Sequence, residues 1–558
     1  MTNKEISRAL RLAGQLMELH GENSFKVRAM QNAAFKTERF PEPLEKLDTA
    51  TLATVDGIGK GLAAKIIELN ERGSFTELDE LVARTPGGVA EMLSIKGIGP
   101  KKVAALWQEL GIESVGELLY ACHENRLVEL KGFGAKTQEQ VRHAIEYAQS
   151  NKGKFHYAVA EMIGTQLLHD LESANLITAC SFTGAMRRKC EIIESIDIIV
   201  DSNGTAAVQG FLHTHPLIDG RSVTVKDKIV YAKSVSGIPL NLHCTDAASY
   251  NKLLFETTAA PAHLEMLRTE NNWNGEVAND EHNLYQSLGL PYIEPELREG
   301  LFEFEWAKAG KMPELVSYSD LRGTLHNHST YSDGVHSLEE MALYCKNMGY
   351  GYLGICDHSQ SAFYANGLKP DRVLKQHEEI DRLNKQLAPF RIFKGIESDI
   401  LVNGSLDYEN DLLAAFDFIV ASVHSVLRMD ESKATARLIS AIENPHTTIL
   451  GHPTGRLLLA REGYPLDFKK IIDACAANGV IIELNANPYR LDLDWRHIPY
   501  ALEKGVQISI NPDAHRQEGI HDMHYGVCTA RKGGLSKEMT FNALDTSAIA
   551  AHFEKRRK

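Results

Sequence analysis

Nine side chains of the metal-binding type lie between residues 323 and 515, in six clusters at the ends of short apolar runs. They are His326, His328, Asp333, His358, Glu397, His424, His452, Asp513 and His515. Imidazoles and carboxylates together are the ligands of borderline and hard divalent ions, and no thiolate belongs to the set. The pattern predicts a metal-dependent hydrolase in the second half of the chain.

The elements that must position these side chains alternate over residues 320–558. Apolar, β-branched segments predict strands at 322–326, 351–356, 391–396, 417–423, 448–451, 479–485 and 506–510. Helical patterns at 337–348, 371–387, 431–442 and 467–478 fall between them. Such alternation predicts parallel strands in a barrel-like α/β domain. The candidate ligands follow the ends of six strands, where the active face of such a barrel lies.

The composition is that of an ordinary globular chain. Its 558 residues exceed what one core can hold, and roughly three to five domains are expected. No apolar run approaches the roughly 18 residues of a membrane span, so we expect no membrane partner. Eight scattered cysteines without a CxxC pair fit reduced thiols in a cytoplasm. The net charge of −14 argues weakly against a nucleic-acid coat over the whole surface, but it allows a local phosphate-binding footprint.

Residues 3–150 have a helical pattern in which one glycine unit recurs three times. Each unit places Gly-apolar-Gly just before an amphipathic helix, with a lysine after it. The residues are Gly57, Gly59, Lys60, Gly97, Gly99, Lys101, Gly132, Gly134 and Lys136. Glycine lets backbone N–H groups face outward at a helix N-terminus, where a phosphate can dock on unpaired donors. One copy would fit an ordinary connection between helices, whereas three copies favour helix-hairpin-helix binding to the DNA backbone without sequence readout.

Residues 1–310 resemble the core of a family-X DNA polymerase. The resemblance implies a lyase-like helical domain with the first hairpin (1–80), helix-hairpin-helix fingers (81–150), an α+β palm (151–258) and a thumb (259–315). In that family a lysine after the first hairpin can form a Schiff base with an abasic sugar, and Lys65 is the matching position. A solvated or phosphate-contacting Lys65 is an equal alternative, and Gly61 replaces a basic residue that often accompanies it.

The palm-like segment lacks most of the catalytic carboxylates of that family. In a strand, residues i and i+2 share a face, so two aspartates at that spacing can hold two magnesium ions. Here Ser195 stands at the first position, only Asp197 remains, and Asn241 stands at the third. Ala185 replaces the triphosphate-binding serine, although Arg187 persists. Neutral side chains cannot bring two cations against the phosphates, which predicts absent or weak polymerase activity.

Residues 320–545 resemble the PHP phosphoesterase family at every expected ligand position. The resemblance implies a distorted (β/α)7 barrel that holds three divalent ions, zinc or manganese, with magnesium as an alternative. It implies one ion at His326, His328, Glu397 and Asp513, a second at Glu397, His424 and His452, and a third at Asp333, His358 and His515. Clustered divalent ions lower the pKa of bound water and neutralise phosphate oxygens. Arg456 and Arg490 are candidates to clasp phosphate, with a structural ion pair to Asp492 or Asp494 as the alternative.

The predicted fold is therefore multidomain: an all-α helix-hairpin-helix region, an α+β palm and thumb, and a C-terminal α/β barrel over 320–558. The predicted function is that of a DNA-repair metallo-phosphoesterase. The resemblance implies 3′→5′ exonuclease activity, or the related 3′-phosphatase or abasic-site endonuclease activities. The expected partner is DNA, bound through its backbone at 3′ ends or gaps by a monomer. Two alternatives stay open: a small-molecule phosphatase resembling histidinol-phosphate phosphatase, and a non-catalytic DNA-binding scaffold.

Overall fold

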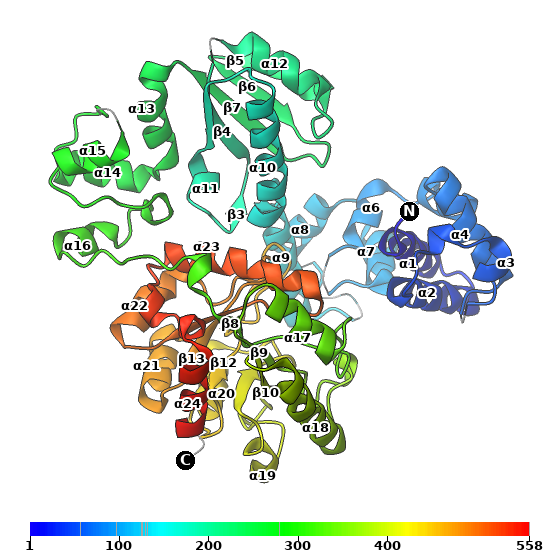
Figure 1. The fold of residues 1–558 in the computed structure, drawn as a ribbon. Helices are drawn as coiled ribbons and strands as arrows, with labels where there is room; N and C mark the ends of the chain where they lie inside the picture. The colour runs from blue at the N-terminus through cyan, green and yellow to red at the C-terminus, as the bar shows by residue number, and fades with distance from the viewer. Residues whose placement is uncertain are drawn as a thin grey trace. The chain divides into compact units, whose positions relative to one another are not determined.

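The computed structural model describes residues 1–556, except for residues 56, 96, 124, 125, 129, 131, 203, 278 and 279. The chain divides into two compact units, Met1–Lys152 and Gly153–Lys558 (Figure 1). The first unit is built from helices, and the second contains a five-stranded and a seven-stranded sheet. Among the described residues, no helix is both long and apolar enough to cross a membrane.

Glycine sets several turns of the first, helical unit. The helices are α1 (Asn3–Leu19), α2 (Ser24–Arg39), α3 (Thr49–Leu52), α4 (Lys60–Arg72), α5 (Thr76–Ala83), α6 (Gly87–Met92), α7 (Pro100–Leu110), α8 (Val115–His123) and α9 (Ala135–Ser150). At the start of α1, the side chains of Thr2 and Glu5 each accept a hydrogen bond from the backbone N–H of the other residue. α4 and α7 end at Gly73 and Gly111, both in the left-handed conformation that glycine adopts without strain. The predicted helical character of this region is confirmed.

The second unit begins with a five-stranded sheet of strand order β2-β4-β7-β6-β5. Its strands are β2 (Ala179–Phe182), β4 (Ile196–Asp201), β5 (Thr224–Lys226), β6 (Ile229–Lys233) and β7 (Pro239–Thr245). β1 (Phe155–His156) and β3 (Ile192–Ile193) pair separately. The associated helices are α10 (Tyr157–Ser173), α11 (Gly184–Arg187), α12 (Thr205–Thr214) and α13 (Ala247–Thr258). Parallel pairing of β4 with β7 sets Asp197 opposite Asn241.

A smaller helical segment, the thumb-like segment, follows the sheet with α14 (Pro261–Glu270), α15 (Glu281–Ser287) and α16 (Glu303–Lys308). Its core is aromatic and includes Phe255, Trp273, Tyr285 and Phe304. The guanidinium of Arg298, which is fully buried, donates to both carboxylate oxygens of Glu281 at 2.8 and 2.9 Å. Arg187 on α11 donates to the same two oxygens at 2.6 and 2.8 Å. This Arg–Glu–Arg cluster fastens the thumb-like segment to the sheet.

The rest of the second unit is a parallel seven-stranded barrel of strand order β14-β13-β12-β11-β10-β9-β8. The strands are β8 (Gly323–Thr324), β9 (Tyr352–Ile355), β10 (Arg391–Asp399), β11 (Phe418–Ser422), β12 (Ile449–Leu450), β13 (Ile481–Asn485) and β14 (Ile508–Asn511). The helices are α17 (Leu338–Asn347), α18 (Pro370–Leu387), α19 (Asn410–Leu413), α20 (Glu431–Ile442), α21 (Phe468–Asn478), α22 (Ile498–Glu503), α23 (Met523–Lys532) and α24 (Thr546–Arg556). All seven predicted strands are present, and the expected α/β barrel is confirmed.

The first and last strands of the barrel are joined by the side chain of Asn542. Its Nδ2 donates to the carbonyls of Gly323 on β8 and Ile510 on β14, at 3.1 and 2.7 Å, and its Oδ1 accepts from the Ile510 N–H at 3.0 Å. A buried strand edge would otherwise leave these backbone groups unpaired, at a free-energy cost. The Asn542 side chain thus helps to close the barrel, together with the hydrogen bond from the His328 N–H to the Ala514 carbonyl at 2.9 Å.

Helix α23 holds the barrel against the five-stranded sheet region. Lys532 at its end is fully buried, and its Nζ donates to Glu299 Oε1 at 2.5 Å and to the Arg188 carbonyl at 2.9 Å. His524 on the same helix contacts Glu161 Oε2 at 2.9 Å. A buried ammonium is tolerated only where it is paired and hydrogen-bonded. These contacts explain why the sheet region and the barrel form one compact unit.

Candidate metal centre

All nine predicted metal ligands meet at the carboxyl ends of the barrel strands. Glu397 lies within β10, and the other eight follow β8, β9, β11, β12 and β14. Glu397 is 1% exposed and is the centre of the cluster. Its Oε1 lies 3.0 Å from His452 Nε2, 3.1 Å from His424 Nε2 and 3.4 Å from His326 Nε2, and its Oε2 lies 2.9 Å from His358 Nδ1 and 3.7 Å from His328 Nε2.

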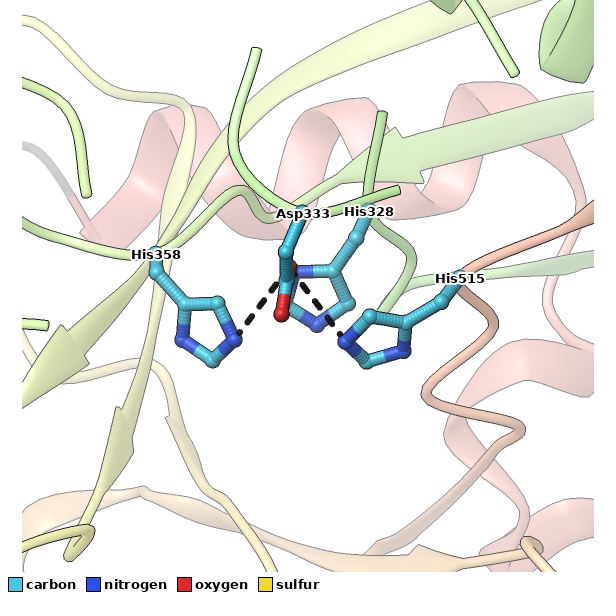
Figure 2. Close-up of side chains that lie close together, drawn as sticks. All are labelled: His328, Asp333, His358 and His515. Atoms are coloured by element: carbon cyan, nitrogen blue, oxygen red, sulfur yellow. Dashed lines mark ion pairs between the residues drawn. The ribbon is translucent and has the colours of Figure 1, made fainter. Parts of the chain in front are cut away.

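The cluster is open on the side of Asp333 and His515. Asp333 Oδ1 lies 3.4 Å from His515 Nε2 and 3.7 Å from His358 Nε2 (Figure 2), and the side chains of Asp333 and His515 are 34% and 38% exposed. The carboxylate of Asp513 also belongs to the cluster, and its Oδ1 lies 3.0 Å from His328 Nε2. The φ of Asp513 is 54°, a left-handed conformation that residues other than glycine rarely adopt. Strain of this kind gathers at functional sites.

The central carboxylates are held ionised. Burial raises the pKa of Glu397, but the charges of His424 and His326 outweigh burial and keep this pKa well below its ordinary value. Burial also raises the pKa of Asp513, and His326 and His328 again outweigh it, so this pKa is also well below the usual range. Ionised carboxylates are the form that divalent cations bind.

The donor atoms form three groups, and the atoms in each lie within 4.8 Å of one another. The groups are His326, His328 and Asp513; His358, Glu397 and His424; and His328, Asp333, His358 and His515. His326 Nε2 and His328 Nδ1 are buried there without a hydrogen-bond partner, which a protein interior rarely tolerates. Cations would satisfy both atoms, and the donor set of imidazoles and carboxylates suits zinc or manganese. The residues therefore fit a metal centre, although the three groups do not include His452.

Two carboxylates that orient the histidines are not among the site residues predicted from the sequence. Glu483 on β13 accepts from His326 Nδ1 at 2.7 Å and from the His452 backbone N–H at 2.8 Å. Asp399 at the end of β10 has its Oδ1 2.6 Å from His424 Nδ1. A carboxylate on the second ring nitrogen fixes the tautomer and leaves Nε2 for a metal. The sequence does point to Glu483, because it is the one acid in the apolar run 479–485. This run is the only one of the seven predicted strands without a candidate ligand at its end.

Replacing Glu483 with glutamine is expected to weaken the binding of metal by about 10- to 100-fold, because His326 loses the acceptor that fixes its orientation. Metal titration monitored by calorimetry measures this change. Glu503→Gln, at an exposed position on α22, is the matched control. Equal affinities for the two variants would contradict an orienting role for Glu483.

The two arginines expected to clasp phosphate differ in their surroundings. Arg456 donates through NH1 to Asp494 Oδ2 at 2.6 Å and through Nε to the Arg490 carbonyl at 2.9 Å, so its guanidinium is engaged by the protein. Arg456 therefore makes the ion pair with Asp494 that was the alternative to phosphate binding. Arg490 Nε lies 3.7 Å from Asp513 Oδ2, at the edge of the metal cluster. Of the two, Arg490 is therefore the better placed to contact a phosphate there.

In the helical unit, Gly57, Gly97 and Gly132 have φ values of 84°, 95° and 91°, the backbone conformation for which glycine was expected. Gly59 and Gly99 are the N-caps of α4 and α7 and make no side-chain capping bond, and Gly134 immediately precedes α9. Lys60, Lys101 and Lys136 are exposed in the first turns of these helices. Each loop therefore presents backbone donors beside a lysine.

Lys65 is paired with an acid. Its Nζ lies 2.6 Å from Glu77 Oε2, and the two side chains are 28% and 29% exposed. The side chain of Lys65 is therefore engaged by the protein in an ion pair.

Asp197, the remaining palm carboxylate, is hydrogen-bonded by the two neutral side chains that occupy the positions of the missing carboxylates. Ser195 Oγ donates to Asp197 Oδ2 at 2.6 Å, and Asn241 Nδ2 donates to Oδ1 at 2.9 Å. His243 Nε2 lies 3.6 Å from the same Oδ1. Arg187, expected at a residual nucleotide site, is committed to Glu281. The three potential metal-binding groups found among the described residues all lie in the barrel.

Three family models match parts of the chain: a helix-hairpin-helix domain over residues 1–75, a SAM-like helix-hairpin-helix tandem over 89–146 and a PHP domain over 324–487. The "DNA polymerase/3'-5' exonuclease PolX" of Bacillus subtilis (strain 168) is 35% identical over 572 residues, which cover 100% of both chains. A "Probable phosphatase" of Thermoanaerobacter sp. (strain X514) is 27% identical over 187 residues, 32% of this chain and 74% of that protein. Another, of Syntrophotalea carbinolica, is 28% identical over 40% of this chain. Similarity to the Bacillus protein thus extends far beyond the part shared with these phosphatases.

Proposed function

Because this chain belongs to the family of the DNA polymerase/3'-5' exonuclease PolX, we propose that it shortens DNA strands from the 3′ end by hydrolysis in its barrel. The proposal also covers two related reactions, removal of a 3′-phosphate and cleavage at abasic sites. The observation that carries it is the meeting of nine imidazole and carboxylate ligands at the active face of a parallel barrel. A PHP domain and helix-hairpin-helix domains in one chain support a phosphoesterase that acts on DNA.

The roles proposed for the barrel residues follow from their surroundings. The three donor groups would hold up to three divalent ions, zinc or manganese, with magnesium as the alternative. Such ions would lower the pKa of a bound water and would neutralise the negative charge of phosphate oxygens. Asp399 and Glu483 keep the histidines in the metal-binding tautomer. The open side at Asp333 and His515 admits the phosphodiester, and Arg490 donates to its oxygens.

DNA binding is proposed for the glycine loops of the helical unit. Uncapped backbone N–H groups at the starts of α4 and α7 can take phosphate oxygens, and the lysine in each first turn adds a positive charge. Contacts of this kind hold the backbone of any sequence. The unit would therefore supply affinity for DNA, while the barrel performs the hydrolysis.

Primer extension by this chain is expected to be absent. Of the three positions matched to palm carboxylates only Asp197 is acidic, and Arg187 is bound to Glu281, so neither two cations nor a triphosphate has its usual ligands. The measurement is extension of a labelled primer on a template with four deoxynucleotides and Mg²⁺ or Mn²⁺. The variant His326→Ala/His328→Ala should be used beside the wild type, because degradation cannot then hide added nucleotides. Extension by that variant would contradict the expected loss.

The proposed function has two rivals, and one assay separates them. A small-molecule phosphatase gains support from the similarity of the barrel to probable phosphatases, whereas a scaffold would bind DNA without cleaving it. Release of nucleotides from a 3′-OH oligonucleotide is compared with hydrolysis of histidinol phosphate, both with Mn²⁺. The proposal expects the oligonucleotide to be the better substrate by kcat/KM. Preference for histidinol phosphate would favour the phosphatase, and inertness toward both would favour the scaffold.

A further inference from the structure

Two loops leave the metal centre side by side and enclose a groove. One loop follows Asp399 at the end of β10, and the other follows His424 after β11; Asp399 Oδ1 and His424 Nδ1 are 2.6 Å apart. The groove has a volume of about 450 Å³ and is lined by Val402, Asn403, Val426, Arg428, Met429 and Lys433. This volume lies within the roughly 300–1,000 Å³ of small-ligand pockets. One groove wall thus begins at His424, a predicted metal ligand, and the other begins at Asp399, which contacts it.

The floor of this groove is a single buried guanidinium. Arg437 on α20 is 4% exposed and lies in the groove lining. Its Nε donates to the Leu401 carbonyl at 2.9 Å, its NH1 to the Ser425 carbonyl at 3.0 Å, and its NH2 to the Ile400 carbonyl. One side chain therefore ties the first loop to the second. A groove braced in this way is formed before any ligand arrives, which reduces the entropy lost on binding.

The groove walls combine exposed apolar groups with positive charge. Val402 is 68% exposed and Val426 57%, and Val426 has a φ of 53°, a strained conformation for a β-branched residue. The charged lining residues are Arg428, Lys433 and the floor residue Arg437. Asp430 pairs with Lys433 at 3.0 Å, but both side chains are more than half exposed, so the pair is weak. The lining residues given above include no carboxylate.

We propose that this groove binds the substrate strand on the 5′ side of the nucleotide held at the metal centre. Arg428 and Lys433 take backbone phosphates, and Val402, Val426 and Met429 contact the sugar and base. Cations beside apolar surface suit a single-stranded nucleic acid, since phosphates recur along the strand and every base has an apolar face. The two loops that line the groove begin at Asp399 and His424 of the metal cluster, which selects the DNA strand as the occupant. The inference rests on the proposed function, because the strand's 3′ end must lie in the barrel.

The activity test uses the variant Arg428→Ala/Lys433→Ala. Its matched control is Arg382→Ala/Lys470→Ala, which removes the same two charges from exposed ion pairs on α18 and α21; Lys470 pairs with the N-cap Asp467 as Lys433 does with Asp430. The groove variant should raise the KM for a single-stranded oligonucleotide roughly tenfold or more, as expected for lost charge-assisted contacts. Its rate on bis(p-nitrophenyl) phosphate, which carries no nucleotides on the 5′ side of the hydrolysed bond, should equal that of the control. Equal KM values for the two variants, or parallel loss on both substrates, would overturn the proposal.

A second measurement does not depend on hydrolysis. Hydrogen exchange of the backbone amides at 400–405 and 424–430 is followed in His326→Ala/His328→Ala with and without a five-nucleotide thymidylate. Slower exchange in both segments, lost when Arg428→Ala/Lys433→Ala is added, supports the groove even if the wild type fails to cleave DNA. Unchanged exchange in both segments refutes the groove while leaving the nuclease proposal intact. The two proposals therefore fail in distinguishable ways.

Discussion

Replacing Glu397 with glutamine is expected to abolish metal-dependent DNA hydrolysis. This carboxylate contacts five histidines and is almost fully buried, so an amide would remove the negative charge at the centre of the cluster. Loss of an outer partner of a metal ligand costs about 10- to 100-fold, and loss of a central ligand should exceed that range. Metal content by mass spectrometry and the rate of oligonucleotide shortening with Mn²⁺ measure the effect.

The control for this variant is Glu339→Gln, which changes an exposed acid on α17 of the same barrel. The control should keep wild-type metal content and rate. Circular dichroism of both variants separates loss of ligation from unfolding. A folded Glu397→Gln protein with full metal content and full activity would remove Glu397 from the centre.

Replacing Glu281 with glutamine is expected to destabilise the second unit strongly. Glu281 accepts four hydrogen bonds from Arg187 and Arg298, and although burial raises its pKa, the two guanidinium groups bring it down to about 2. Glutamine would leave the buried charge of Arg298 and the partly buried charge of Arg187 without compensation. Removal of one partner from a buried ion pair costs about 3–5 kcal/mol of the free energy of unfolding. Urea unfolding followed by tryptophan fluorescence reports the change.

Glu276→Gln provides the comparison, because Glu276 pairs with Lys252 at 3.4 Å on the surface of the same region. An exposed pair contributes about 0–1 kcal/mol, so this control should unfold nearly as the wild type does. Similar unfolding midpoints for the two variants would show that the buried cluster does not hold the thumb-like segment to the sheet. The expected difference would explain why Arg187 persists at a palm site that has lost two of its three carboxylates.

The fold of the barrel and the convergence of its ligands were predictable from local pattern. The predicted strands are short apolar or β-branched runs, and an acid or imidazole at the carboxyl end of such a strand must lie on one face of a parallel barrel. The three glycine units could also be recognised from the sequence, and Gly57, Gly97 and Gly132 all have a positive φ, which glycine adopts without strain.

Contacts between distant segments were not predictable. Asn542 closes the barrel from beyond its last strand, and Glu483 supports His326 across 157 residues of sequence. Arg187 was predicted to belong to the residual polymerase site, yet its partner Glu281 lies 94 residues away on α15, and no sequence pattern links the two. The spacing of residues along a strand or helix fixes a shared face, whereas such pairings depend on how elements pack.

The central claim is that the barrel hydrolyses DNA from its 3′ end, and end-labelled DNA tests it most directly. The wild type, His326→Ala/His328→Ala and Lys65→Ala are each incubated with 5′-labelled or 3′-labelled oligonucleotides and Mn²⁺, Zn²⁺ or Mg²⁺. We expect successively shorter 5′-labelled strands and early release of the 3′ label with Mn²⁺, the same pattern for Lys65→Ala, and intact DNA with the double variant. Intact DNA with the wild type in all three metals, or wild-type cleavage by the double variant, would contradict the claim.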